Sequence, residues 1–333
     1  MKILVTGAAG FVGSHVLKRL HELEINASGI DNFSSYYSVQ YKLERLRKFG
    51  LDSEKCIENC EISNFLELRD MMKKYQPDYI IHLAAQAGVR LSLSESDNYI
   101  SSNVLGFHNV VKASIDCGAK GILYASSSSV YGDSTPTPYQ ENSLTLRPKS
   151  IYGVTKLSNE LFADIYAKTS GLIFRGLRYF TVYGPWGRPD MAYFRIASAS
   201  LGEGEFTLFG DGSIKRDFTY IDDVVDNTIA LVQDLQRFPM GFHDIVNIGG
   251  SRPLDMNYLI QTISKLTGNV PKIKRGVESN VDSRVTMADN SYLKSILGNL
   301  KFTELEFGVR NLIDWAKQES IRPHLQKWIQ SVN

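Results

Sequence analysis

The sequence predicts an α/β protein in which a doubly wound parallel sheet is joined to a smaller C-terminal lobe. In the first half of the chain, short apolar runs rich in β-branched residues alternate with longer segments of helical spacing, a pattern typical of consecutive βαβ units. After about residue 180, glycine and proline divide the chain into shorter elements. We therefore expect a sheet domain over residues 1–180 and a second lobe over residues 181–333, with some interleaving of the two.

The expected strands are short and apolar enough to be buried on both faces, and they span residues 2–6, 26–30, 79–83, 121–125 and 172–178. Between them, apolar residues recur at helical spacing over residues 13–23, 66–75, 106–117 and 150–170. In the second lobe the same spacing predicts helices over residues 221–235, 254–266 and 307–319.

Composition excludes several classes of partner. The 37 basic and 36 acidic residues leave a net charge of +1 without long runs of one sign, so we expect neither nucleic acid nor a membrane surface as a partner. The apolar run at residues 80–89 is too short to span a bilayer. Cys56, Cys60 and Cys117 lack the second Cys or His pair that a metal site needs. With no visible export signal, reduced thiols in a cytoplasmic protein are the expectation.

A glycine-rich turn, residues 6–13, connects the first strand to the first helix. Gly7 permits a tight turn, Gly10 lets a pyrophosphate approach the backbone, and Gly13 allows the helix to pack closely on the sheet. The helix N-terminus supplies N–H donors and a positive dipole. Strand, spacing and helix together predict a Rossmann-type dinucleotide site.

The cofactor preference is indicated by Asp31, which ends the second expected strand. A carboxylate there can accept hydrogen bonds from both hydroxyls of the adenine ribose and would repel a 2′-phosphate. We expect NAD rather than NADP, although an Asp after a strand can also be a solvent-facing turn residue.

Tyr152 and Lys156 are four residues apart, so they share one face of the helix expected over residues 150–170. A phenol is a poor base at neutral pH, and a nearby ammonium would lower its pKa. The same spacing also occurs in surface aromatic–lysine pairs. The serine run 126–129 supports a catalytic role for the Tyr152/Lys156 pair. It follows a buried strand, at the edge where open α/β sheets bind their ligands.

Over nearly its whole length, the chain resembles the extended short-chain dehydrogenase/reductases, in the nucleotide-sugar epimerase and dehydratase family. The segments that carry the resemblance are residues 6–13, Asp31, 82–85, Asn103, 126–132, Tyr152, Lys156, 178–185, 216–218, Thr286, Ala288 and Asp289. The resemblance implies that Tyr152 is the catalytic base, that Lys156 binds the nicotinamide ribose and that Ser127 hydrogen-bonds the sugar 4-hydroxyl.

The resemblance also implies two sets of binding residues. Those for NAD are Gly7, Ala9, Gly10, Phe11, Val12, Gly13, Asp31, Asn32, Glu61, Ile62, Leu83, Ala84, Ala85, Asn103, Tyr152, Lys156 and Tyr179. Those for a UDP-sugar are Ser127, Ser128, Ser129, Tyr152, Thr181, Arg188, Arg195, Arg216 and Asp282. Glu61 departs from the family's usual Asp, and Ser279 stands where some relatives carry an Arg that binds the diphosphate. A homodimer is implied through helices that begin near Gly106 and Ser150.

The reaction within the family follows from the residues after Ser127. Dehydratases carry Asp-Glu where this chain has Ser128-Ser129, and decarboxylases carry Glu at the position of Ser129, which leaves redox at C4 and hence 4-epimerisation. Residues 179–192 and 86–90 are similar to UDP-glucuronate 4-epimerases, and many galactose-type enzymes have Asn in place of Thr181. The alternatives are a UDP-hexose or UDP-N-acetylhexosamine 4-epimerase and, from another class, a catalytically silent NAD-binding scaffold.

Overall fold

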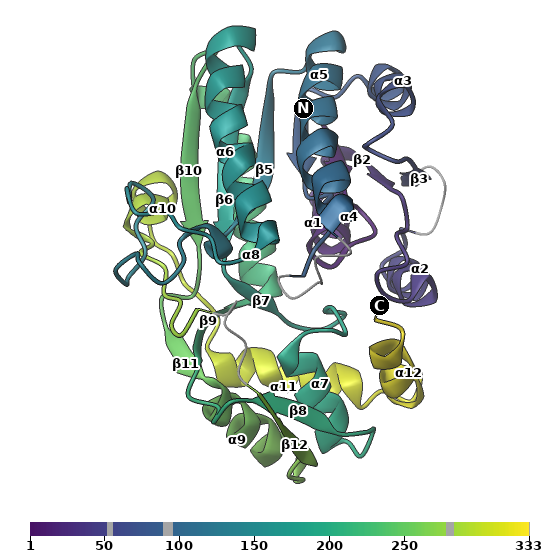
Figure 1. Ribbon diagram of the computed structural model, residues 1–333. Coiled ribbons are helices and arrows are strands. Elements are labelled where there is room, and N and C mark those ends of the chain that lie inside the picture. Colours follow the sequence, from purple (N-terminus) through teal and green to yellow (C-terminus); the bar gives the residue numbers. More distant parts are fainter. Residues whose placement is uncertain (52–55, 89–95, 278–282, 333) are drawn as a thin grey trace.

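A parallel sheet of seven strands forms the centre of the larger layer in the computed structural model, which describes residues 1–51, 56–88, 96–277 and 283–332. Its order is β10-β6-β5-β4-β1-β2-β3 (Figure 1). The strands are β1 (Lys2–Thr6), β2 (Asn26–Asp31), β3 (Ile57–Asn59), β4 (Tyr79–His82), β5 (Gly121–Ser127), β6 (Ile173–Tyr179) and β10 (His243–Ile248). This order reverses direction between β1 and β4, the switch point at which doubly wound sheets bind ligands.

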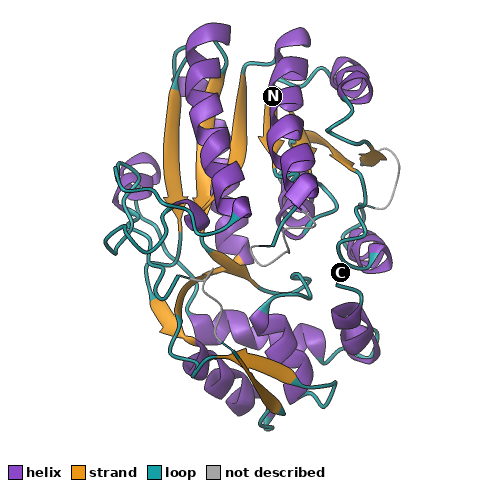
Figure 2. Ribbon diagram, viewed as in Figure 1, coloured by secondary structure: helices purple, strands orange, loops and turns teal. Residues whose placement is uncertain are grey.

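Helices cover both faces of the sheet (Figure 2). One face carries α3 (Phe65–Tyr75), α5 (Gly106–Asp116) and α6 (Ile151–Ser170), and the other carries α1 (Phe11–Glu22) and α8 (Ile221–Asp234). Side chains of β1 alternate between the two faces of the sheet. Ile3 and Val5 pack in the cluster that includes α1 and α8, whereas Leu4 packs with α5. The doubly wound sheet expected from the sequence is therefore confirmed.

Several elements of this layer were not expected, among them β3, β10 and α2 (Val39–Lys48). β10 comes from the second half of the chain and pairs in parallel with β6, with His243 opposite Phe174 and Ile248 opposite Tyr179. α8 likewise lies against α1. The boundary at residue 180 itself stays a prediction.

The second lobe is built from a three-stranded and a two-stranded sheet with helices around them (Figure 1). Its strands are β7 (Thr181–Tyr183), β8 (Phe206–Phe209), β9 (Lys215–Tyr220), β11 (Pro253–Asp255) and β12 (Ile273–Gly276). Its helices are α7 (Ala192–Ser200), α9 (Met256–Thr267), α11 (Leu305–Ala316) and α12 (Leu325–Gln330), while α4 (Ser96–Tyr99) and α10 (Ser291–Leu297) lie beside the larger sheet.

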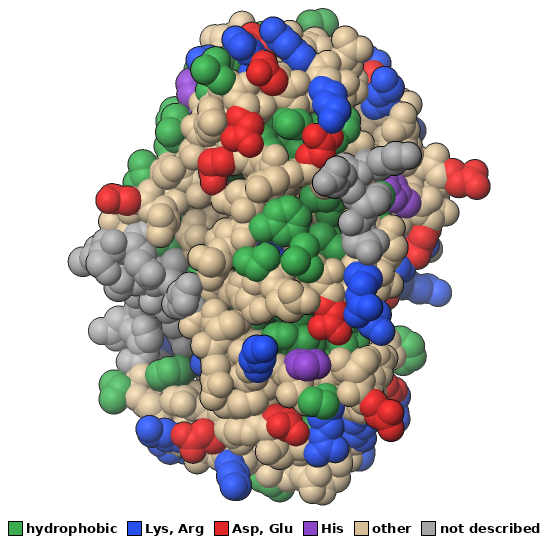
Figure 3. Space-filling view, turned by 90° about the vertical axis from the view of Figure 1, so that its right-hand side faces the viewer, with side chains coloured by type: hydrophobic (Ala, Val, Ile, Leu, Met, Phe, Trp, Pro, Cys, Tyr) green, Lys and Arg blue, Asp and Glu red, His purple; other side chains and the backbone are tan. Residues whose placement is uncertain are grey.

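The surface carries mixed charge. On the face shown in Figure 3, Lys and Arg side chains are interspersed with Asp and Glu. Within the described ranges, no helix combines the length and the apolar composition needed to cross a bilayer, and no cluster of three His, Cys, Asp or Glu side chains is arranged to hold a metal ion.

Candidate active site

A pocket of about 770 Å³ lies where the carboxyl ends of the sheet strands meet the second lobe. Its walls include the ends of β1, β2, β4, β5 and β6 on one side, and parts of α7, β8 and β9 on the other. A pocket of this size, at the switch point of the sheet, fits a dinucleotide together with a second ligand better than a single small metabolite.

The glycine turn forms the floor of this pocket. Gly7 has a φ of +71°, and a Cβ on it would lie 2.6 Å from the Ala84 backbone nitrogen. A Cβ on Gly13 would lie 2.1 Å from the Gly7 carbonyl oxygen, so both positions require glycine. Gly10 is the N-cap of α1 and gives the helix no side-chain cap. Phe11 and Val12, whose amides belong to the first turn of α1 and have no partner within the helix, line the pocket, so this helix end is suited to bind an anion.

Asp31 is placed beside this turn at the end of β2 and is almost fully buried. Its Oδ2 accepts from the Ala9 amide at 2.9 Å, and its Oδ1 accepts from the Phe33 amide at 2.8 Å. These two amides fix the carboxylate in the pocket wall and leave further lone pairs for ribose hydroxyls.

The wall beyond Asp31 contains Asn32, Glu61 and Ile62. The Asn32 side-chain amide donates to Glu61 Oε2 at 2.7 Å, and the Ser63 amide donates to Glu61 Oε1 at 3.0 Å. The Glu61 carboxylate is thus turned toward its protein neighbours, while the apolar side chain of Ile62 lies against the pocket.

Tyr152 and Lys156 both line the pocket from α6, one helical turn apart. The helix begins there because the Ser150 hydroxyl caps it by accepting from the Gly153 amide at 3.1 Å. Lys156 Nζ donates to the Ala125 carbonyl at 2.8 Å and lies 5.8 Å from the centre of the Tyr152 ring. Burial lowers the pKa of Lys156 from 10.5 to about 8.

Lys156 is not among the groups that shift the pKa of Tyr152, contrary to the expectation from their spacing. Burial raises the pKa of the Tyr152 phenol above its usual 10, and the groups that oppose this shift are the Arg188 guanidinium and a hydrogen bond with Ser127. Desolvation outweighs both of them because the phenol lies deep in the pocket. The cation that favours the phenolate here is therefore Arg188.

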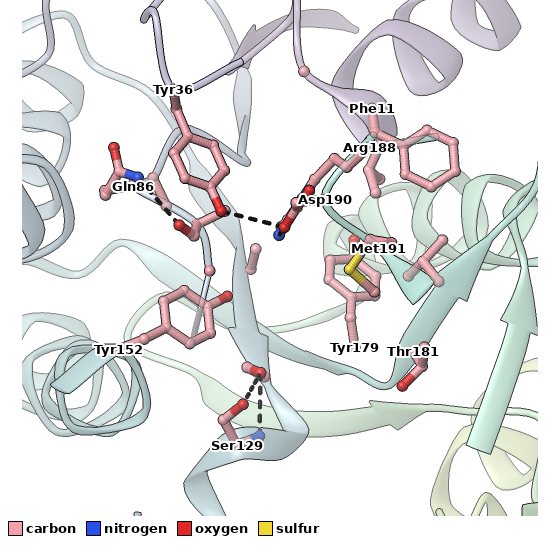
Figure 4. Close-up of a pocket in the computed structure, with 18 of the residues that line it drawn as sticks. Phe11, Tyr36, Gln86, Ser129, Tyr152, Tyr179, Thr181, Arg188, Asp190 and Met191 are labelled. Atoms are coloured by element: carbon pink, nitrogen blue, oxygen red, sulfur yellow. Dashed lines mark hydrogen bonds and ion pairs between the residues drawn. The ribbon is translucent and has the colours of Figure 1, made fainter. Parts of the chain in front are cut away.

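The serine run turns sharply at the end of β5. Ser127 Oγ accepts from the Ser129 amide and donates to Ser129 Oγ, both at 3.1 Å (Figure 4). Residues Ser128–Val130 form a single 3-10 turn, and Ser127, Ser128 and Ser129 all line the pocket. Thr181, at the start of β7, lines the same pocket.

The loop at residues 184–191, here called the substrate loop, carries Arg188 into the pocket. Arg188 donates from Nε to Asp190 Oδ1 at 3.0 Å and from Nη2 to Asp190 Oδ2 at 2.5 Å. Tyr36 donates to Asp190 Oδ2 at 3.2 Å from the opposite side of the pocket (Figure 4). Asp190 and Tyr36 were not among the expected site residues, and their spacing along the chain gives no sign that they meet.

The remaining candidates divide between the pocket and its surroundings. Arg195 on α7 and Arg216 on β9 line the pocket, and Arg216 Nη1 donates to the Ser283 carbonyl at 2.6 Å. Asp282, Ser279 and residues 89–90 lie outside the described residues. The backbone stretch Leu83, Ala84 and Ala85, together with Tyr179, also lines the pocket.

Two of the expected cofactor residues lie behind the pocket wall. Ala9 is fully buried. The buried Asn103 side chain donates to the Gln86 carbonyl at 3.2 Å and to Thr155 Oγ1 at 3.0 Å, so it joins the loop after β4 to α6. Each of them is hydrogen-bonded to a residue that does line the pocket, Ala9 to Asp31 and Asn103 to Gln86.

Comparison with known proteins agrees with this geometry. The sequence model described as "NAD dependent epimerase/dehydratase family" matches residues 3–249. The UDP-glucuronate 4-epimerase of Thermodesulfobacterium geofontis is 36% identical over 316 residues, covering 95% of this chain and 96% of that protein. Protein CapI of Staphylococcus aureus is 34% identical over 95% of this chain and 98% of its own length.

A solved structure gives the same result. UDP-glucuronic acid 4-epimerase from Bacillus cereus, in complex with UDP-glucuronic acid and NAD, superposes with a TM-score of 0.86 at 32% identity. The match covers 96% of this chain and 99% of that one. Fold, glycine turn, Tyr152/Lys156 pair and sequence comparison together show that the chain belongs to the NAD-dependent epimerase/dehydratase family.

Proposed function

We propose that the protein interconverts UDP-glucuronic acid and UDP-galacturonic acid by epimerisation at C4, with NAD retained through turnover. The observation that carries the proposal is that four hydroxyl-bearing residues line the same pocket as Tyr152, namely Ser127, Ser128, Ser129 and Thr181. Relatives and a solved neighbour that are named UDP-glucuronate 4-epimerases support it.

The pocket has the features that NAD requires. The uncapped N-terminus of α1, with Phe11 and Val12 in its first turn, would hold the diphosphate, and Gly10 lets it approach the backbone. Asp31 would accept hydrogen bonds from the adenine ribose, Ile62 would contact the adenine, and Lys156 would bind the nicotinamide ribose. When bound, NAD supplies a reversible hydride acceptor at C4 of the sugar.

Tyr152 would move the proton in both halves of the reaction. Its phenolate takes the proton of the sugar 4-hydroxyl, and Ser127 holds the same oxygen in place by a hydrogen bond. The 4-keto sugar then turns in the pocket, and Tyr152 returns the proton to O4 on the other face. Arg188 and the Ser127 hydrogen bond both favour the phenolate against the cost of burial.

The serine turn also explains why a uronic acid could survive this chemistry. A 4-keto uronic acid is a β-keto acid, which loses carbon dioxide when its C–CO₂ bond aligns with the carbonyl π system. Hydroxyls at Ser128, Ser129 and Thr181 can hold the carboxylate out of that alignment by hydrogen bonds without supplying an acid. Arg188 would add a cation near the substrate.

The test is to incubate purified protein with UDP-glucuronic acid, without added NAD, and to follow the products by NMR. An equilibrium mixture with UDP-galacturonic acid supports both the C4 chemistry and a retained cofactor. Turnover of UDP-glucose or UDP-N-acetylglucosamine alone would leave a 4-epimerase but refute the carboxylate assignment. Carbon dioxide or a UDP-pentose formed at a comparable rate would refute the role of the serine turn.

A homodimer through α5 and α6 belongs to the same proposal. These helices lie side by side on the outside of the sheet (Figure 1), and Leu161, Phe162 and Ile165 of α6 are 65%, 41% and 58% exposed. Large apolar side chains that recur on one outer helix face are typical of an interface between subunits. The cytoplasmic location expected from the sequence stays a prediction.

A further inference from the structure

We propose that Arg45 is a positioning residue that couples the cofactor turn to the substrate loop. This inference rests on the proposed function, because it takes the glycine turn as the binding segment for NAD and the substrate loop as the binding segment for the UDP-sugar. Arg45 lies on α2 and is fully buried, outside the lining of the pocket.

The contacts of Arg45 join segments that are far apart in the sequence. Nη2 donates to the Ala9 carbonyl in the glycine turn and to the Tyr37 hydroxyl, and Nη1 donates to the Trp186 carbonyl in the substrate loop at 2.9 Å. One turn earlier on α2, the Tyr41 hydroxyl donates to the Gly187 carbonyl at 2.8 Å. α2 thus holds two consecutive carbonyls of the substrate loop while it holds one carbonyl of the cofactor turn.

On the cofactor side, Arg45 fixes a peptide plane. The Ala9 carbonyl points to Arg45, and the Gly10 amide on the other side of the same peptide donates to the Gly7 carbonyl at 2.9 Å. A trans peptide directs its C=O and N–H in opposite directions, so these two bonds together fix the orientation of the peptide. Gly10 is the N-cap of α1, and this orientation sets how the helix amides face the diphosphate.

On the substrate side, Arg45 holds a strained residue. Trp186 has a φ of +60°, in the left-handed region that bulky residues avoid. The hydrogen bond from Arg45 to its carbonyl and the stacking of its indole on Tyr41, at 5.5 Å between ring centres, keep it there. Arg188 follows two residues later, so the conformation at Trp186 determines where the Arg188 guanidinium enters the pocket.

The charge of Arg45 points to a ligand as well. Two other deeply buried arginines have their own carboxylates, Arg175 with Asp234 and Asp244, and Arg178 with Glu160. Among the described residues Arg45 has only neutral oxygen acceptors and the Tyr41 ring, and its buried Nε has no partner. A buried cation without a counter-ion is costly, so an anionic diphosphate bound across the glycine turn would compensate a charge that the protein leaves open.

The experiment compares holoenzymes of Arg45→Met and Arg45→Lys with Arg47→Met, a matched control in which an exposed arginine of the same helix is replaced. The measurement is the rate of NAD release after dilution, with and without UDP as the second ligand. In the wild type and in Arg47→Met, UDP should slow NAD release by about tenfold, which is an ordinary coupling between sites. In Arg45→Met, NAD should leave about tenfold faster, and UDP should no longer change the rate.

Two further variants distinguish a loss of coupling between the UDP and NAD sites from a general loss of protein stability. Arg45→Lys keeps the charge but cannot reach both carbonyls, so it should retain NAD better than Arg45→Met while still losing the effect of UDP. Tyr41→Phe removes only the hydrogen bond to the Gly187 carbonyl, so NAD release without UDP should stay normal, while UDP should slow that release less than it does in the wild type. If Arg45→Met does not fold, these two variants decide the question.

Unchanged NAD release and unchanged UDP coupling in the Arg45 variants would overturn the proposal. The readout needs no turnover of the sugar. A protein that fails to epimerise UDP-glucuronic acid would therefore refute the proposed substrate without touching the role of Arg45.

Discussion

Lys156→Met should make the protein more stable at neutral pH while abolishing its activity. The side chain is 2% exposed, and burial lowers its pKa from 10.5 to about 8. At roughly 1.4 kcal/mol for each pKa unit, holding the charged form in the folded protein costs about 3 kcal/mol. The lost hydrogen bond to the Ala125 carbonyl offsets about 1 kcal/mol of the gain.

The pH dependence of unfolding tests whether the Lys156 charge destabilises the folded protein. Because the folded-state pKa lies below the unfolded value, the unfolded chain binds more protons between pH 8 and pH 10.5, and the stability of the wild type rises with pH in that window. Relative to the Lys156→Met variant, the wild type should gain about 2–3 kcal/mol between pH 7 and pH 10.

The assay is urea unfolding of nucleotide-free protein at several pH values, followed by circular dichroism. Lys168→Met is the matched control, since Lys168 is an exposed lysine of the same helix whose replacement removes only a surface ion pair with Asp164. A stability difference between wild type and Lys156→Met that stays constant from pH 7 to pH 10 would refute the assignment of Lys156 as a desolvated cation.

Four other changes test the site and the surface. Tyr152→Phe should keep bound NAD and lower kcat by about 10³-fold; unchanged turnover would remove Tyr152 from the role of base. Gly13→Ala should lower both the melting temperature and NAD retention, because its Cβ would lie 2.1 Å from the Gly7 oxygen. Ser129→Ala should raise carbon dioxide release from UDP-glucuronic acid relative to epimerisation, measured by NMR, and an unchanged ratio would count against the serine turn. Ile165→Glu should shift the protein from dimer to monomer in light scattering; a wild type that is already monomeric would contradict the interface.

The sequence was a good guide wherever apolar periodicity and glycine geometry decide the structure. The glycine turn, the strands β1, β2, β4, β5 and β6 and the helix that carries Tyr152 could be predicted, because each depends on local spacing that burial enforces. α2 was missed because its buried face includes Lys42 and Arg45, which belong to the polar pattern of a surface helix. β3 has three residues, too few for a period to be recognised.

The site was predictable only as far as its residues lie in short motifs. Ser127, Tyr152 and Lys156 each belong to a local pattern, and the structure brings them to one pocket. The contact of Tyr36 with Asp190 joins residues 154 positions apart, and no local pattern encodes it. The pKa of Tyr152 could not be judged either, since burial and the approach of Arg188 exist only in the folded chain.

The position of β10 at the edge of the sheet bears on how the chain folds during synthesis. Until residue 248 has left the ribosome, β6 lacks its outer neighbour, and the buried Arg175 lacks the carboxylates of Asp234 and Asp244. An unpaired β6 would expose a row of backbone groups to other nascent chains. Completion of the sheet therefore waits for about three quarters of the polypeptide, and a fragment ending at residue 180 should aggregate rather than fold.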